Sequence, residues 1–379
     1  MKHAEEYRDG RVAQALAARI AGEADPAGSY HFMEFCGGHT HAISRYGIED
    51  LLPEVVRLIH GPGCPVCVLP VGRIDAAIRL AERPGVTLCT YGDVMRVPGS
   101  RGTSLLRAKA AGADIRMVYS TLDALRIAEA EPGREVVFFA IGFETTTPPT
   151  ALAIRLAARQ GLANFSVFCN HVLTPPAIQN ILDSPELRRL DCVRLDGFIG
   201  PAHVSTVIGT EPYAFFAEEF EKPVVVAGFE PLDVLQAVLM LIRQVNEGRH
   251  EVENQYGRAV RREGNERAKA DVAEIFELRR SFEWRGLGVV PYSGLRLKEK
   301  YSAYDAERRF GIESLPARDN PACECGAILR GVKRPADCKL FGTVCTPETP
   351  MGSCMVSAEG ACAAHWTYGR FRDRAGRAS

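Results

Sequence analysis

The 379-residue sequence lacks three features, and each absence excludes a class of protein. It has no basic surplus, since 46 lysines and arginines stand against 47 aspartates and glutamates, so nucleic acid is not an expected partner. The most apolar windows, such as Val234 to Ile242, are far too short to span a bilayer, so no membrane partner is expected. The polar N-terminus has no apolar signal segment. We expect a cytoplasmic, globular protein with two or three domains.

Half of the twelve cysteines lie within forty residues near the C-terminus, at positions 323, 325, 338, 345, 354 and 362. In a reducing compartment, this density favours metal binding or thiol redox chemistry over a disulfide framework. This tail has no CxxC pair, which structural zinc prefers, and widely spaced single cysteines favour an iron–sulfur cluster. Zinc and plain thiol storage stay open as alternatives.

Short apolar runs alternate with amphipathic stretches, and this alternation predicts βαβ units with parallel sheets. The expected strands are His31–Phe35, Val55–Ile59, Val86–Thr90, Ile115–Tyr119, Val136–Ile141, Phe165–Cys169, Gly197–Ile199, Val224–Ala227 and Leu287–Pro291. The expected helices are Arg11–Ile20, Gly72–Arg83, Thr103–Ala111, Thr121–Ala130, Thr150–Gln160, Pro175–Leu182, Pro231–Val245 and Ala303–Phe310. Helical spacing is also expected from Val272 to Leu278, and after about residue 246 the βα pattern ends.

Cys36 directly follows an expected strand and is followed by two glycines and by His39 and His41. A thiolate with nearby imidazoles is typical of a transition-metal site or of a nucleophilic thiol. The glycines are expected to keep this thiol reachable for a ligand. The alternative is that Cys36 is a small buried residue.

Cys64 and Cys67 form a CxxC pair inside a turn rich in glycine and proline. A single CxxC in a βα context favours a redox dithiol, and a structural knuckle is the alternative. Cys89, Cys169 and Cys192 lie in or near apolar runs and are expected in the core.

Glu144 follows an expected strand and precedes three threonines and a proline. One threonine is expected to cap the next helix, but an acid and three hydroxyls exceed what a cap needs. His171 and His203 also follow strands, and each is either structural or functional. Ligands in open α/β sheets bind beyond the carboxyl ends of strands. The residues expected there are Cys36, Cys64, Glu144, His171 and Glu230.

Four motifs, in this order, resemble the HypD family of [NiFe]-hydrogenase maturation factors. They are EFCGGHTH at residues 34–41, GPGCPVC at 61–67, GFETTTP at 142–148 and CMVSAEGAC at 354–362. The resemblance runs from about residue 30 to about 368, and it implies two α/β domains plus a domain with a [4Fe-4S] cluster. With the chain order, it predicts α/β domains at 31–132 and 133–245, and an iron–sulfur domain formed by 1–30 and 246–379.

The resemblance implies an assembly scaffold rather than a multiple-turnover enzyme. The scaffold acts with the small chaperone HypC to build the Fe(CN)2CO unit, and HypE delivers the cyanide. Cys36 would then hold the iron, and Cys64 and Cys67 would be the redox pair. The further catalytic candidates are His39, His41 and Glu144.

The family's cysteine spacing selects Cys323, Cys338, Cys345 and Cys362 as cluster ligands. It leaves Cys325 and Cys354 as a candidate second thiol pair. Taking Cys325 for Cys323 shortens the first gap only from fourteen to twelve residues, so both stay open. A second hypothesis is an iron–sulfur disulfide reductase resembling ferredoxin-thioredoxin reductase, with Cys36 incidental. The CxxxCxxC triad of radical enzymes that use S-adenosylmethionine is absent.

Overall fold

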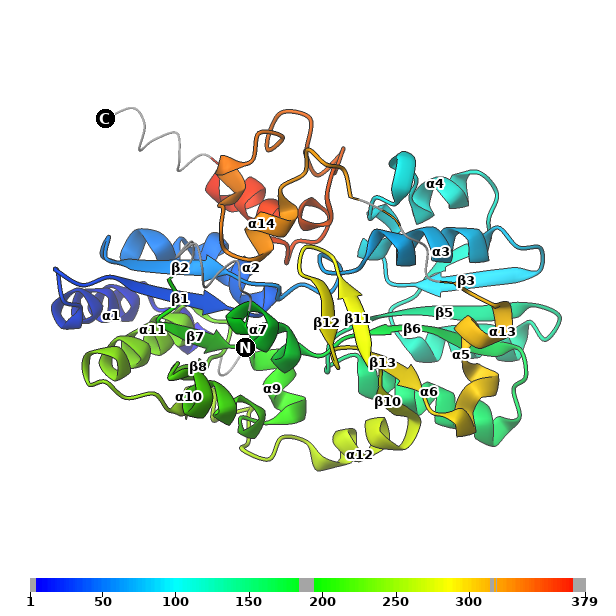
Figure 1. Cartoon of the computed structure of the whole chain (residues 1–379), viewed down its shortest axis with the longest axis horizontal. Coiled ribbons are helices and arrows are strands. Elements are labelled where there is room, and N and C mark those ends of the chain that lie inside the picture. The colour runs from blue at the N-terminus through cyan, green and yellow to red at the C-terminus, as the bar shows by residue number, and fades with distance from the viewer. Residues whose placement is uncertain (1–4, 184–193, 314–316, 318, 371–379) are drawn as a thin grey trace.

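The computed structural model describes residues 5–183, 194–313, 317 and 319–370, and two parallel sheets form its framework (Figure 1). The sheets lie side by side along the long axis, and the cysteine-rich tail lies over the region between them. The predicted α/β fold class is confirmed. Within the described ranges, no helix is long and apolar enough to cross a membrane.

The five-stranded sheet combines an early and a late segment of the chain. In spatial order its parallel strands are β2 (Val56–His60), β1 (Tyr30–Glu34), β7 (Gly197–Gly200), β8 (Val224–Val226) and β9 (Val252–Asn254). Glu34 pairs with both His60 and Ile199, so the carboxyl ends of the three strands β2, β1 and β7 meet at one edge. The loops at that edge form the natural place for a ligand site.

The four-stranded sheet lies, in chain order, between β2 and β7 of the other sheet. Its parallel strands, in spatial order, are β4 (Ile115–Met117), β3 (Val86–Thr90), β5 (Glu135–Gly142) and β6 (Phe165–His171). β5 is buried along nearly its whole length, and its sequence is therefore a continuous apolar run. The predicted boundary between residues 132 and 133 runs through this sheet, because β3 and β4 precede it while β5 and β6 follow it.

Helices cover both sheets (Figure 1). Those of the five-stranded half are α1 (Gly10–Glu23), α2 (Gly37–Tyr46), α9 (Ala202–Ile208), α10 (Ala214–Phe220) and α11 (Pro231–Asn246). Those of the four-stranded half are α3 (Val71–Ala81), α4 (Leu105–Ala110), α5 (Thr121–Ala130) and α6 (Thr147–Gln160). α11 packs against α1, α2, β7 and β8, so the N-terminal helix belongs to the five-stranded half.

The remaining elements connect the two halves and form the tail. They are α7 (Thr174–Asp183), α12 (Glu266–Ile275), α13 (Ala306–Phe310), α14 (Cys325–Leu329), α15 (Ala361–Ala364), and the antiparallel pairs β10 (Phe276–Leu278) with β13 (Leu295–Leu297) and β11 (Ser281–Trp284) with β12 (Gly288–Pro291). The expected helical spacing from Val272 to Leu278 is wrong beyond Ile275, because Phe276–Leu278 pairs with β13 as a strand. The tail buries Ile328, Leu329 and Met355 in the core that α3 and β3 also form.

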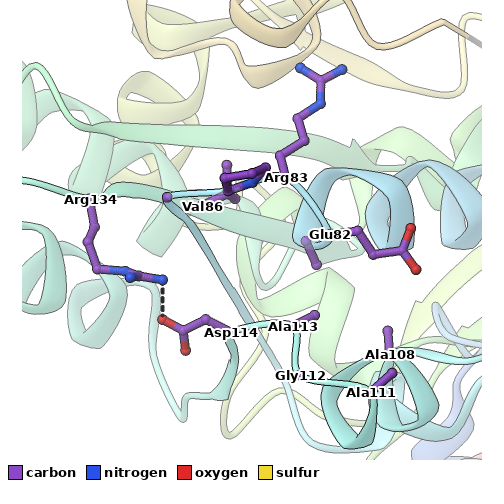
Figure 2. A pocket seen from close by; sticks show the side chains of 12 residues that line it. Glu82, Arg83, Val86, Ala108, Ala111, Gly112, Ala113, Asp114 and Arg134 are labelled. Carbon is purple, nitrogen blue, oxygen red and sulfur yellow. Dashed lines mark hydrogen bonds and ion pairs between the residues drawn. The ribbon is translucent and has the colours of Figure 1, made fainter.

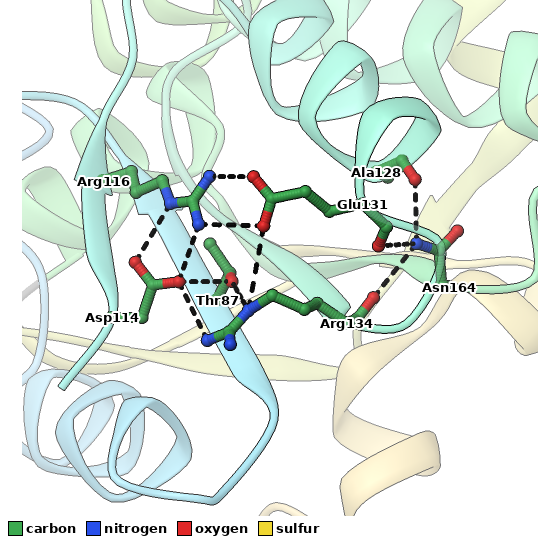
Figure 3. A network of polar contacts seen from close by, with 7 residues as sticks. All are labelled: Thr87, Asp114, Arg116, Ala128, Glu131, Arg134 and Asn164. Atoms are coloured by element: carbon green, nitrogen blue, oxygen red, sulfur yellow. Dashed lines mark hydrogen bonds and ion pairs between the residues drawn. The ribbon is translucent and has the colours of Figure 1, made fainter.

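An ionic network ties together the loops at the amino ends of β3, β4 and β5 (Figure 3). Arg116 Nη2 donates to Asp114 Oδ2 at 2.9 Å and to Glu131 Oε2 at 3.0 Å. Arg134 donates to Asp114 Oδ2 and to the hydroxyl of Thr87, each at 2.9 Å. The hydrogen bond from Arg116 is the main reason that the pKa of Asp114 lies below its ordinary value. The network fixes the edge of the sheet opposite to the carboxyl ends.

Candidate functional site

Cys36 lies between β1 and α2, at the carboxyl edge of the five-stranded sheet. It is the N-cap of α2, and the N–H groups of His39 and Thr40 donate to its carbonyl oxygen at 2.8 and 3.1 Å. Its own N–H donates to Glu34 Oε2 at 2.8 Å. The residue is only 5% exposed. The expectation of a reachable thiol is therefore wrong for this structure.

The two glycines after Cys36 make room for side chains. A Cβ on Gly37 would lie 2.4 Å from the Cβ of Glu359, and a Cβ on Gly38 would lie 2.5 Å from the ring of Phe229. An acid from the tail and an aromatic ring from the loop after β8 therefore pack closely onto the backbone beside the thiol.

His203 is the imidazole beside the Cys36 thiol. Its Nδ1 lies 4.0 Å from Cys36 Sγ, and its ring packs on Phe229 with the centroids 4.2 Å apart. Burial lowers the pKa of His203, and the nearby His39 lowers it further. A neutral imidazole thus lies next to the thiol at neutral pH.

The two histidines predicted from the motif point to different places. His39 Nε2 bonds to the carbonyl oxygens of Ala227 and Gly228 at 3.0 and 2.9 Å and therefore carries the proton. Burial lowers the pKa of His39, and its buried Nδ1 has no hydrogen-bond partner in the described part of the chain. His41 Nε2 instead bonds to the hydroxyl of Tyr368 at 3.1 Å.

Burial and acidic neighbours keep the Cys36 thiol protonated. Burial raises its pKa to about 12, and the carboxylates of Glu359 and Glu34 add to the rise, while a hydrogen bond from the Gly38 backbone opposes it. A metal ion that binds this sulfur must therefore displace a proton.

The CxxC turn packs directly against Cys36. The N–H of Gly37 donates to the carbonyl oxygen of Gly63 at 3.0 Å, and a Cβ on Gly63 would lie 2.4 Å from the nitrogen of Cys36. Cys64 and Cys67 form a disulfide with their Cα atoms 5.2 Å apart, and both are buried. The structure thus brings the Cys36 motif at 34–41 into contact with the CxxC motif at 61–67.

Gly63→Ala is expected to destabilise the protein by about 1–3 kcal/mol, because the new methyl group meets backbone atoms that cannot rotate away. Urea unfolding monitored by circular dichroism would measure this loss. Gly133→Ala is the matched control, since a Cβ there meets no atom within 4 Å. Equal midpoints for the two variants would contradict the close packing of the CxxC turn on Cys36.

One residue links the CxxC turn to the tail. The hydroxyl of Ser353 donates to the carbonyl oxygen of Cys67 at 2.7 Å, and Cys67 Sγ lies 3.8 Å from the carbonyl oxygen of Ser353. The next residue, Cys354, is fully buried. The redox pair predicted from the CxxC motif and the cysteine tail are thus neighbours.

The tail cysteines form one cluster. The Cys325 thiol interacts with the thiols of Cys323, Cys354 and Cys362, and the first of these contacts is the main cause that lowers the pKa of Cys323 to about 7. Gly352 lies against this group, because a Cβ there would be 2.4 and 2.5 Å from Sγ of Cys323 and Cys325.

Cys345 lies beside this group, because the N–H of Met351, the neighbour of Gly352, donates to Cys345 Sγ at 3.4 Å. Burial raises the pKa of Cys345, and the charges of Cys323 and Cys338 contribute to the rise. The four predicted cluster ligands therefore lie near enough to act on one another's pKa values, as do both members of the candidate second pair. No group of three or more His, Cys, Asp or Glu side chains, among the residues the structure describes, is arranged to hold a single metal ion.

Glu144 lies in the turn between β5 and α6. Its carboxylate accepts hydrogen bonds from the N–H and the hydroxyl of Thr174 at 2.8 and 3.0 Å, and burial raises its pKa to about 7. The expected threonine cap is wrong, because Thr146 stands at the N-cap but its hydroxyl donates to the carbonyl oxygen of Phe143. Burial raises the pKa of Tyr213, and the charges of Glu144 and Cys36 add to the rise.

The other singled-out residues have structural partners. His171 Nε2 bonds to the hydroxyl of Thr150 at 2.9 Å, and burial lowers its pKa to about 4. Glu230 caps α11 and accepts a hydrogen bond from Arg8 at 2.8 Å. Cys89 and Cys169 are fully buried, as predicted. Cys192 lies outside the described residues.

Two acids at the site were missed by the sequence analysis. Glu34 is fully buried and accepts hydrogen bonds from the Cys36 N–H, the Thr40 hydroxyl and, at 2.9 Å, His60 Nδ1. A glutamate inside an apolar strand was the available signal. Glu359 lies inside the motif at 354–362, but no local feature of that motif indicates its position beside Cys36.

A cavity of about 360 Å³ lies elsewhere, at the amino ends of β3 and β4 (Figure 2). Arg134 and Asp114 pair with each other across its wall, whereas Arg83 and Glu82 extend from the loop before β3. Two of the charged residues in its wall, Arg134 and Asp114, thus already belong to the ionic network. The cavity lies at the amino ends of the strands, whereas Cys36 and the CxxC turn follow carboxyl ends.

Comparisons with known proteins agree on one family. The family model described as "Hydrogenase formation hypA family" (HypD) matches residues 11–369. The chain is 77% identical over 374 residues to hydrogenase maturation factor HypD of Rhizobium leguminosarum bv. viciae, covering 99% of this chain and 97% of the relative. It is 68% identical to that of Cupriavidus necator over 98% of each chain, and 50% identical to that of Escherichia coli over 89% and 88%.

Proposed function

The chain belongs to the HypD family and is a hydrogenase maturation factor, and from this premise we propose that it is a redox-active scaffold. It holds iron while the Fe(CN)2CO unit of [NiFe]-hydrogenase is assembled. The observation that supports this most is the contact of the CxxC turn with Cys36 on one side and with the cysteine cluster on the other.

In this proposal Cys36 holds the iron, which is the cargo of the scaffold. Its sulfur is a soft donor, which suits an iron that carries cyanide and carbonyl ligands. The neutral imidazole of His203, at 4.0 Å from the sulfur, can take up the proton that iron displaces. His39 supports the site through Phe229, against which both imidazoles pack.

Cys64 and Cys67 are proposed to cycle between dithiol and disulfide. Closing the disulfide releases two electrons and two protons. Their disulfide lies next to Cys36 through Gly63 and next to Cys354 through Ser353, so an electron has a short route in both directions. Glu144 bonds to Thr174 and His41 bonds to Tyr368, so this proposal gives neither side chain a redox step.

The tail is proposed to hold a [4Fe-4S] cluster on Cys323, Cys338, Cys345 and Cys362, with Cys325 and Cys354 as a second thiol pair. The donor set fits such a cluster, because the thiols of Cys323, Cys345 and Cys362 come from separate turns and act on one another's pKa values. When bound, the cluster would supply electrons one at a time.

The proposed partners are a HypC-type small chaperone and a HypE-type cyanide donor, acting together in the cytoplasm. The test is an infrared spectrum of the anaerobic protein purified with its small chaperone. Cyanide and carbonyl bands on iron are the expected result. Their absence, together with multiple-turnover reduction of a protein disulfide, would favour the second hypothesis, an iron–sulfur disulfide reductase, which the Cys67–Ser353 contact also supports.

Cys64→Ser is expected to remove a two-electron thiol step without loss of cluster iron, because the CxxC pair is bonded to itself and not to the tail thiols. Thiol labelling in graded redox buffers, followed by mass spectrometry, would measure the step. Cys89→Ser is a suitable control, since that thiol is buried in β3. If Cys64→Ser lost its iron, the assignment of the pair would fail.

A further inference from the structure

Arg285 is a buried cation in the turn between β11 and β12. This turn contacts both the CxxC turn and the cysteine-rich tail. The residue is 5% exposed, and its N–H donates to the carbonyl oxygen of Val68, directly after Cys67, at 2.7 Å. The hairpin stands between the two halves, below α14 (Figure 1). A Cβ on Gly286 would lie 2.8 Å from the Cα of Gly326, which shows that the turn packs on the backbone of α14.

The guanidinium of Arg285 has only part of its hydrogen-bonding capacity used. Its Nη2 pairs with Asp319, whose side chain is 41% exposed. Its Nε and Nη1 are buried and have no hydrogen-bond partner within the described residues. Buried donors of this kind are rare in native proteins because each is costly, so their persistence points to a group that accepts from them in the working protein.

The tail offers an acceptor of the right charge. Gly286 packs against Gly326, which directly follows Cys325 in α14, so the turn that carries Arg285 lies at the tail cysteines. Glu324, the acid between Cys323 and Cys325, pairs with Lys333 through its Oε1. Sulfur held by the tail cysteines is therefore the acceptor that fits Arg285.

We propose that Arg285 is a positioning residue that donates to, and balances the charge of, the sulfur atoms held by the tail cysteines, and so sets the reduction potential of that centre. This inference rests on the proposed iron–sulfur function of the tail. Reduction adds one negative charge to a buried centre, and a fixed cation beside it stabilises the reduced form. Arg285 therefore raises the potential, and its backbone keeps the CxxC turn at the same place.

The test is a reductive titration of the anaerobic, iron-loaded full-length protein, followed by absorbance and by electron paramagnetic resonance. Arg285→Met is expected to raise the ratio of oxidised to reduced centre at least tenfold at a given applied potential. This change corresponds to a reduction potential lower by about 59 mV for a one-electron couple. Arg285→Lys, which keeps the charge, should fall between the parent and Arg285→Met. Arg280→Met is the control, because it removes an exposed arginine directly before β11. At a given applied potential, its ratio of oxidised to reduced centre should stay within twofold of that of the parent.

Each outcome decides the matter. An iron-loaded Arg285→Met or Arg285→Gln that titrates like the parent overturns the proposal. If neither uncharged variant keeps iron and sulfide while Arg285→Lys does, the need for charge is supported. If Arg285→Lys loses them too, the residue is only structural and the proposal fails. A parent protein without iron and sulfide overturns the cluster itself, and this inference with it.

Discussion

Cys36→Ser is expected to abolish the cyanide and carbonyl infrared bands and, with them, [NiFe]-hydrogenase maturation in a cell that relies on this protein. The exchange replaces a soft thiolate donor by a hard hydroxyl that stays protonated. The cluster content should survive, because the tail thiols are separate residues. Because Cys36 is buried, we also expect a loss of about 1 kcal/mol in the free energy of unfolding, limited by the polar neighbours His203 and Glu359.

Cys89→Ser provides the matched control, since it places the same hydroxyl at a fully buried position of β3. That variant should lose more stability, about 1–3 kcal/mol, yet keep the infrared bands. The measurements are the infrared spectrum, the iron and sulfide content and the melting temperature on both variants. Normal bands in Cys36→Ser, with a melting temperature lowered as in Cys89→Ser, would show that Cys36 is only a core residue.

Local sequence pattern was sufficient for the strands that are buried on both faces. The run at 136–141 lies within β5, and the run at 86–90 coincides with β3, because a strand covered by helices on both sides must be apolar throughout. The carboxyl ends of these strands could therefore be placed in the sequence. Cys36 was found in that way, at the end of β1.

Pairing between strands could not be derived in the same way. β1 pairs with β7 across an interval that contains the entire four-stranded sheet, and no local feature of either strand specifies that neighbour. The partners of Cys36 depend on this pairing: His203 follows β7 and Phe229 follows β8, far from Cys36 in sequence. The motif histidines were named because they are near in sequence, whereas the imidazole beside the thiol comes from another strand.

The tail shows the same limit for packing. Segments with few regular elements usually bury little core of their own. The structure instead buries Ile328, Leu329 and Met355 in a core shared with α3 and β3. Apolar residues in irregular segments carry no periodicity that would indicate this. The tail therefore has two sources of order, its apolar contacts and whatever its cysteines bind.

Cys345→Ser is expected to remove the iron–sulfur centre while leaving most of the fold in place. Cys345 is buried, and its charge interacts with Cys323 and Cys338, so it belongs to the converging donor set. Loss of one thiolate ligand should reduce the content from about four irons and four sulfides to well below one cluster per chain. Iron and sulfide analysis of anaerobic protein, with absorbance in the visible range, would measure this.

The shared core sets the size of the accompanying effect on the fold. With Ile328 and Leu329 still buried against the body of the protein, the tail should become more sensitive to protease without unfolding of the two sheets. Cys323→Ser and Cys325→Ser, compared in parallel, would decide which of these contacting thiols is a ligand, since only the ligand variant should lose iron. Full iron and sulfide in Cys345→Ser, or stoichiometric zinc without sulfide in the parent, would refute the iron–sulfur assignment of the tail.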